Sequence, residues 1–393
     1  MKLGVVFLTG WLCVQQLHAE EADTASVNRR VELSLSPSAI LHTNGYLKGE
    51  NPEHLMMNHS TSVRMTYAIG AAEGTRQERR YPDTYQGVGV EWNSMNHLLG
   101  RPVSAFVYQI SRLARISDRL SAHYEWNLGL TFGWHPYDPD TNPDNRVIGS
   151  RVTACLHGAM SLCWRLSPWA DLSAGIAFNH YSNGNTSIPN GGLNTLGPTL
   201  SLACYPDRRQ SDNAPKAVPT TADEQPRRLD CDILLYAAYR RQGYMTDKWG
   251  SVALPNKFLV VGMNINPMVR LNRRARVGAS ADVVMDRGAN IDVNDYLVRY
   301  SKNGFHPVDP KTPPLKRQTA LGLSARGELT LPWFSINAGL GRNIIGAHGD
   351  LNRWYQVLAL KIAVLPRTFV HIGYTLQDFE YPNHLMLGVG YSL

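Results

Sequence analysis

The sequence predicts an all-β protein, a transmembrane antiparallel β-barrel of about 16 strands, with about 12 to 16 as the range. Apolar and polar residues alternate with a period of two through almost the whole chain, as in strands with one apolar face. Many alternating stretches exceed the roughly 5 or 6 residues usual in soluble sheets, and aromatic residues lie near their ends. Beyond the first residues, no apolar run approaches the roughly 18 residues of a spanning helix. A soluble β-sandwich is the weaker interpretation.

The amino terminus has the pattern of a Sec-type signal peptide. Met1 and Lys2 form a short basic start, and an apolar run follows from Leu3 to Val14. A small residue, Ala19, offers a cleavage site. We therefore expect a signal peptide over residues 1–19 and an outer-membrane β-barrel over residues 20–393.

The strongest strand pattern runs from Ala122 to Trp134, where aromatic and aliphatic residues alternate with polar ones. The expected strands include the residues 31–35, 63–69, 88–92, 106–110, 122–134, 152–164, 172–178, 196–202, 233–239, 259–265, 277–285, 321–331, 336–340, 358–364, 370–376 and 385–393. The last of these carries Gly388, Tyr391 and Leu393, an arrangement that resembles the terminal assembly signal of outer-membrane barrels.

The connections should alternate between short inner turns and longer outer loops. The segment from Asn183 to Gly192 falls on the outer side, whereas Arg165 to Pro168 falls on the inner side. The segment from Pro206 to Arg228 is an exception, because it is long and still falls on the inner side. Either it is a disordered periplasmic loop or the strand count is off.

Few residues outside one hairpin carry a chemical prediction. Cys204 ends one expected strand and Cys231 begins the next, so an oxidising compartment could join them in a disulfide. The alternative is two half-buried thiols. No metal-ligand spacing joins His123, His135 and His157, which we expect in the lumen or at the rim. The net charge of +7 fits an anionic partner such as a phosphorylated glycolipid, and no nucleic-acid motif is present.

That hairpin places three side chains capable of nucleophilic catalysis on one face of two strands. If it is symmetric about residue 187, His180 lies opposite Asn194 with Cβ atoms about 5 Å apart, and Ser182 follows roughly 6.6 Å along the strand. This geometry permits a Ser-His-Asn relay. The same face carries Ile176 and Leu196, and in a barrel that face contacts lipid. The pattern therefore indicates a substrate that is itself a membrane lipid.

The hairpin also carries a family resemblance. His180-Tyr181-Ser182-Asn183 followed by Pro189-Asn190-x-Gly192 resembles the signature of the lipid A 3-O-deacylases, outer-membrane barrels that cleave an ester-linked acyl chain from lipid A. That family uses His, Ser and Glu, and here Asn194 stands in place of the Glu. The His-x-Ser-Asn-Gly core is also similar to that of outer-membrane phospholipase A, whose triad is Ser-His-Asn.

The resemblance implies an outer-membrane esterase that removes an acyl chain from lipid A or lipopolysaccharide without a cofactor or metal. His180, Ser182 and Asn194 would be catalytic, and backbone N–H groups near Asn183 and Gly184, aided by Asn190, would stabilise the oxyanion. The first alternative is an outer-membrane phospholipase A, which would imply calcium and a homodimer. The second is a non-enzymatic, porin-like barrel.

Overall fold

The computed structural model describes residues 27–71, 81–208, 229–246, 250–254, 256–272, 274–291, 298–301, 304–307, 311–379 and 381–393. The expected signal peptide over residues 1–19 lies outside these ranges, as does most of the connection from Pro206 to Arg228. Within them, no helix is both long enough and apolar enough to cross a membrane.

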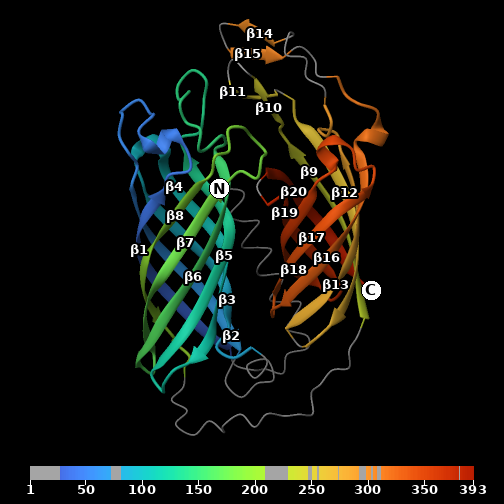
Figure 1. Cartoon of the computed structure of the whole chain (residues 1–393). Helices are drawn as coiled ribbons and strands as arrows, with labels where there is room; N and C mark the ends of the chain where they lie inside the picture. Colours follow the sequence, from blue (N-terminus) through green and yellow to red (C-terminus); the bar gives the residue numbers. More distant parts are fainter. Residues whose placement is uncertain are drawn as a thin grey trace. The chain divides into compact units, whose positions relative to one another are not determined.

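Sixteen long strands form two closed antiparallel barrels of eight strands each (Figure 1). The first barrel closes where its first strand pairs with its eighth, and the second closes where β20 pairs with β9. The strands of the first barrel are β1 (Val27–Leu41), β2 (His59–Ala71), β3 (Tyr85–Ser94), β4 (Gly100–Arg115), β5 (Leu120–Trp134), β6 (Val152–Ser167), β7 (Ala170–Ser182) and β8 (Leu193–Cys204). Those of the second are β9 (Leu229–Arg240), β12 (Phe258–Arg270), β13 (Ala275–Asp286), β16 (Thr319–Thr330), β17 (Phe334–Ile345), β18 (Trp354–Leu365), β19 (Thr368–Gln377) and β20 (Tyr381–Ser392).

The strand count agrees with the sequence, but the expectation of one barrel over residues 20–393 is wrong. β8 pairs with β7 on one side and with β1 on the other, so it has no edge left for β9. The physical reason is that the segment from Pro206 to Arg228 separates β8 from β9 by more residues than a hairpin turn, so β8 is free to pair with the start of its own half. This connection joins two barrels and is not an inner loop of one.

Four short strands and four 3-10 helices complete the described structure. They lie in connections that the alternation left as loops. The short strands pair as two small sheets, β10 (Gly243–Thr246) with β11 (Gly250–Ala253) and β14 (Val298–Ser301) with β15 (Gly304–Pro307). The 3-10 helices are η1 (Gly45–Lys48), η2 (His97–Leu99), η5 (Leu315–Arg317) and η6 (Gly349–Leu351).

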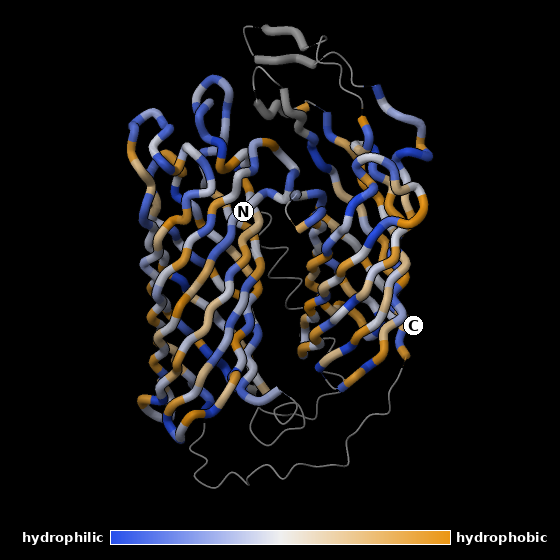
Figure 2. Tube along the Cα trace, viewed as in Figure 1, coloured by the Kyte–Doolittle hydropathy of each residue, from blue (hydrophilic) through white to orange (hydrophobic). Residues whose placement is uncertain are grey.

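Each strand turns its apolar side outward and its polar side into the lumen. In β1, Leu33 and Leu35 are 57% and 48% exposed, whereas the alternate residues Arg30 and Glu32 are buried. Figure 2 shows hydrophobic and hydrophilic residues following one another along the strands of both barrels. A soluble protein would turn its apolar face inward, so this inverted arrangement is that of an outer-membrane barrel.

Buried polar side chains fill the lumen of the first barrel. Arg30 donates to the hydroxyls of Tyr108 (2.7 Å) and Tyr205 (3.1 Å) and pairs with Glu32. Arg64 pairs with Glu125 in the same lumen. A barrel of eight strands is just wide enough for its interior to be filled by such side chains. The lumen is therefore a packed polar core.

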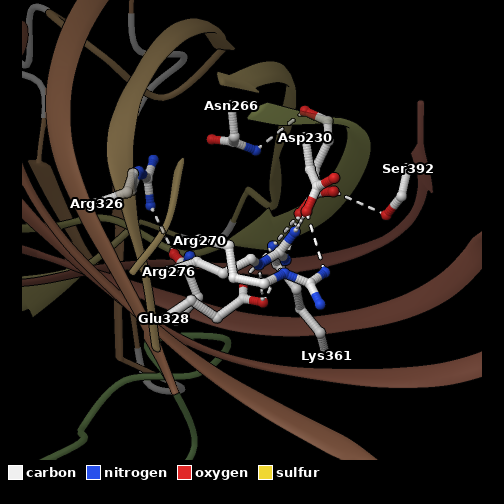
Figure 3. A network of polar contacts seen from close by, with 10 residues as sticks. Asp230, Asn266, Arg270, Arg276, Arg326, Glu328, Lys361 and Ser392 are labelled. Carbon is white, nitrogen blue, oxygen red and sulfur yellow. Dashed lines mark hydrogen bonds and ion pairs between the residues drawn. The ribbon is translucent and has the colours of Figure 1, made fainter. Parts of the chain in front are cut away.

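The second barrel has an ion-pair network of its own in the lumen (Figure 3). Lys361 Nζ donates to Asp232 (2.8 Å) and Glu328 (2.6 Å), and the Arg276 guanidinium bridges the same two carboxylates. The Ser392 hydroxyl donates to Asp232 at 2.7 Å. These residues come from five strands, so the network ties opposite walls of the barrel together.

Replacing Asp232 by alanine should destabilise the second barrel by about 3–5 kcal/mol, because Lys361 and Arg276 would lose a buried partner. Guanidinium-induced unfolding in detergent micelles, followed by tryptophan fluorescence, measures this change. Arg353→Gln is the matched control, since its ion pair with Asp378 is 38% exposed on both sides and should contribute less than about 1 kcal/mol. Equal effects of the two variants would contradict a structural role for the network.

Of the two alternatives for Cys204 and Cys231, the structure has the half-buried free thiols. The two residues belong to separate barrels, and each is fixed by the hydrogen bonds of its own sheet. Cys204 lies opposite Val31 and Ala170, and Cys231 lies opposite Pro267.

Candidate active site

The β7–β8 hairpin has the register that the sequence predicts. His180 and Asn194 are directly paired, and the pairing continues with Phe178 opposite Leu196. Along β7 the even-numbered residues face outward, and along β8 the even-numbered residues do the same. His180, Ser182 and Asn194 therefore all lie on the outer surface of the first barrel, at the end of the strands.

A hydrogen bond of 2.6 Å joins His180 Nδ1 to Asn194 Oδ1. An amide oxygen only accepts hydrogen bonds, so Nδ1 is the donor and carries the ring proton. The other ring nitrogen, Nε2, then has its lone pair free. This is the tautomer that a histidine needs to remove a proton from a neighbouring hydroxyl.

Ser182 is the last residue of β7 and follows His180 on the same face. It is half-buried and lies opposite Ala154 of β6. Within the part of the chain that the structure describes, no hydrogen bond holds the Ser182 hydroxyl. The hydroxyl can therefore turn toward His180, which lies two residues away, roughly 6.6 Å along the strand.

The loop that follows Ser182 depends on residues that tolerate left-handed backbone. Gly184 and Asn185 have φ values of 60° and 65°, and Gly192 has a φ of 69° where the chain returns to β8. Glycine and asparagine enter this region at least cost. At Gly192 an added Cβ would lie in ordinary contact with His180 Cε1, at 3.4 Å, so it is the left-handed backbone that favours glycine there.

Asn190 holds the residue that follows Ser182. Its Oδ1 accepts from the backbone N–H of Asn183 at 3.0 Å, while Asn183 Nδ2 donates to the carbonyl of Ser187 at 2.9 Å. The N–H of Asn183, an expected oxyanion donor, is thus engaged with Asn190 in this structure. Asn190 acts here as a support for the loop.

Two neighbouring loops fix the return of the hairpin. The backbone N–H groups of Gly191 and Gly192 donate to the carbonyls of Arg146 and Val147, both at 3.1 Å. From the first loop of the barrel, the Thr43 hydroxyl donates to the carbonyl of Gly192 at 3.0 Å. The chain is therefore fixed at Gly192, two residues before Asn194.

The loop that contributes Arg146 is stabilised by its own turn. The backbone N–H groups of Thr141 and Asp140 donate to Asp138 and hold the pKa of that exposed carboxylate below its usual value. A lowered pKa in the folded state means that the carboxylate stabilises the loop above its ordinary pKa and loses this effect only as the pH falls through the lowered value. The turn is thus kept at neutral pH.

A buried network lies behind the outward-facing residues, and sequence reasoning missed it. Asn179 Nδ2 donates to Thr195 Oγ1 at 3.1 Å, and Asn179 Oδ1 meets His157 Nδ1 at 2.7 Å. The other nitrogen of His157 contacts Glu125 at 2.8 Å. The expectation that His157 lies in the lumen is confirmed. The sequence did contain a signal for this network. The polar residues Asn179 and Thr195 are next to His180 and Asn194 and lie on the opposite face of the strands.

Apolar side chains surround the site on the outer surface. Leu156 of β6 lies opposite His180, and Leu41 of β1 lies opposite Asn194. One pair further along the hairpin are Phe178 and Leu196. The site therefore combines a base and a hydroxyl with an apolar surround. In the described residues, no group of three or more His, Cys, Asp or Glu is placed to hold a metal ion.

Two family models match the chain, and their limits follow the two barrels. Residues 62–203 match the model described as lipid A 3-O-deacylase (PagL), and residues 230–393 match the acyloxyacyl hydrolase C-terminal domain. The first match ends beside the last residue of β8, Cys204, and the second begins one residue after β9 does. No curated protein sequence is similar enough to the chain to count as a match.

Solved structures of membrane barrels are similar to the chain at low identity. The outer membrane enzyme PagL is 13% identical, with a TM-score of 0.32, over 43% of this chain and 97% of that one. The siderophore receptor PirA from Pseudomonas aeruginosa is 9% identical, with a TM-score of 0.25, over 95% of this chain and 82% of that one.

Proposed function

The chain belongs to the lipid A 3-O-deacylase family, whose members are carboxylic ester hydrolases, and we propose that its first barrel cleaves an acyl ester of lipid A with Ser182, His180 and Asn194. The hydrogen bond between His180 Nδ1 and Asn194 Oδ1 carries this proposal, because it sets the tautomer in which the imidazole can act as a base. It lies on the face that carries Ser182, in an outer-membrane barrel.

The proposed reaction is an acyl transfer in two steps. His180 Nε2 takes the proton of Ser182 as the hydroxyl attacks the ester carbonyl, and it then returns that proton to the departing sugar alkoxide. Water, activated by the same imidazole, next attacks the acyl-serine and releases the fatty acid. Each step leaves the proton on His180 only briefly, so no other base is required.

Asn194 orients the imidazole but supplies no negative charge. A carboxylate in this position would also stabilise the imidazolium that forms as the proton moves. The family resemblance places a Glu here, so the amide should make this enzyme slower than one with the carboxylate. The oxyanion donor is proposed to be the N–H of Gly184, because the N–H of Asn183 already donates to Asn190, which holds that part of the loop.

The outward position of the three residues supports a membrane lipid as the substrate. Polar side chains on the lipid-facing surface of a barrel are costly, more so with depth. His180 and Ser182 lie at the end of β7, near the membrane interface, beside the exposed apolar residues Leu156 and Leu41. An ester carbonyl near the head groups could reach Ser182 while its acyl chain stays in the bilayer.

One cation favours lipid A over a phospholipid as the substrate. Arg146 is exposed, its carbonyl binds Gly191 beside the hairpin, and its guanidinium lies 5.7 Å from the centre of the Tyr137 ring. The structure pairs it with no carboxylate among the residues described. A free cation on the outer side of the site suits the phosphates of lipid A better than a zwitterionic head group.

Product analysis tests the proposal directly. Purified protein is incubated with vesicles that contain lipid A and phosphatidylethanolamine together, and the products are weighed by mass spectrometry. We expect lipid A shortened by one acyl chain, free fatty acid and intact phospholipid, with no change when calcium is chelated. Release of lysophospholipid in a calcium-dependent reaction would favour the phospholipase alternative.

The packed lumens argue against the porin-like alternative. We expect no stable single-channel conductance from the purified protein in planar bilayers, because side chains such as Arg30 and Lys361 bridge the interior of each barrel. A porin of known conductance, reconstituted in the same bilayers, is the positive control. Large, ohmic channels from the wild-type protein would show that a lumen opens.

A further inference from the structure

One outward-facing glycine lies next to the proposed site along the membrane-facing surface. Gly158 of β6 is paired with Phe178 of β7 and with Trp126 of β5. Two residues before it, Leu156 lies opposite His180. Gly158 is therefore one step of roughly 6.6 Å from the row of the imidazole, on the side toward the middle of the membrane.

The fold itself does not require a glycine at this position. An added Cβ at Gly158 would find its nearest neighbour, the carbonyl oxygen of Glu125, only at 4.0 Å, and the backbone is not left-handed. At Gly129 and Gly175, by contrast, a Cβ would lie 2.1 Å from a backbone oxygen. A glycine inside a strand is destabilising compared with alanine, and at this position, next to the proposed site, the missing side chain leaves empty space on the lipid-facing surface.

Large apolar side chains border this space. Trp126 and Phe178 stand on either side across the strands, and Leu156 and Met160 stand before and after it along β6. Phe178 is 38% exposed and Met160 is 61% exposed, so both project from the barrel wall into the lipid. These four residues therefore surround an outward-facing position without a side chain, where an added Cβ would meet nothing nearer than 4.0 Å, and we call this position the notch.

We propose that this notch is the subsite for the acyl chain that is cleaved, and that Gly158 makes the enzyme selective for long acyl chains. The inference rests on the proposed function. With the ester carbonyl at Ser182, the first carbons of the chain pass His180 and Leu156, and the following methylenes lie between Trp126 and Phe178. Contact with two aromatic rings and Met160 orders the chain, which holds the ester at Ser182.

Gly158→Leu tests this subsite by filling the notch with a side chain that remains compatible with lipid. The variant and the wild type are compared on lipid A with long acyl chains and on p-nitrophenyl butyrate, whose four-carbon chain is too short to pass Leu156. We expect kcat/KM for lipid A to fall roughly tenfold or more, while the value for the short ester changes less than about twofold. For Gly158→Ala, kcat/KM for lipid A should lie between the values of the wild type and of Gly158→Leu.

Gly327→Leu is the matched control. Gly327 faces outward on β16 of the second barrel, and a Cβ there would meet nothing within 4 Å, so the variant adds the same side chain to a lipid-facing surface. It should leave both activities unchanged. Heat modifiability, the difference in gel mobility between unheated and heated samples, verifies that each barrel is folded.

The subsite is refuted if Gly158→Leu matches the wild type on both substrates, or if it slows both substrates equally. Failure of the proposed function itself looks different. In that case the wild-type protein would hydrolyse neither ester, or would do so equally well after His180→Ala.

Discussion

Ser182→Ala is expected to reduce the release of fatty acid from lipid A by roughly 10⁴-fold or more, because the acyl-enzyme cannot form without the hydroxyl. Binding should persist, since the apolar residues around the site and Arg146 are unchanged. Initial rates with purified protein in mixed micelles, together with the affinity of the inactive variant for lipid A, measure both effects. His180→Ala should cost about as much, since the two residues act as one unit.

Ser173→Ala is the matched control for this variant. Ser173 lies on the same strand but is buried on the lumen side, the face opposite His180 and Ser182. It should retain full activity. Substantial hydrolysis by Ser182→Ala, with the protein folded, would remove Ser182 from the mechanism and leave only a water activated by His180.

Asn194 should show two opposite effects. Asn194→Ala removes the acceptor of His180 Nδ1, so the ring loses its fixed tautomer and orientation, and kcat should fall about 100-fold. Asn194→Asp places a carboxylate of the same size there and should raise kcat by up to about tenfold, equivalent to ~1.4 kcal/mol, by stabilising the imidazolium. Pre-steady-state measurements of fatty acid release distinguish a change in the rate of the chemical step from a change in the rate of product release.

Thr195→Val serves as the neighbouring control on β8, because Thr195 faces the lumen and lies next to Asn194 without touching the imidazole. Its effect on kcat should be small compared with that of Asn194→Ala. Wild-type activity in Asn194→Ala would exclude Asn194 as the third member. An aspartate variant slower than the alanine variant would mean that the site rejects a negative charge.

The alternation of apolar and polar residues was enough to find all sixteen barrel strands, because in a membrane barrel successive residues of a strand face the lipid and the lumen in turn. It could not show which strands close the sheet. Alternation indicates which face of the sheet a side chain lies on, but it does not identify the neighbouring strand. From the sequence alone, β8 could therefore pair with β1 or with β9. Only the unusual length of the segment from Pro206 to Arg228 hinted at the break.

At the candidate site, the prediction held where pairing rules apply. His180 and Asn194 meet because a hairpin of known symmetry must bring them together. The role of Asn190 depends on the path of an irregular loop, which pairing rules do not determine. The lumen network through Asn179 and His157 needed the neighbours across β6 and β7, which become known only when the registers are known.

The outward orientation of His180 and Ser182 has a kinetic consequence. An enzyme whose site faces the lipid meets its substrate by diffusion within the membrane. Its rate therefore depends on the mole fraction of lipid A in the membrane and not on the total concentration of lipid A in the sample. Adding inert detergent at constant total lipid A should slow turnover in proportion to the dilution of the surface. In cells, the same dependence would tie activity to the composition of the surrounding leaflet.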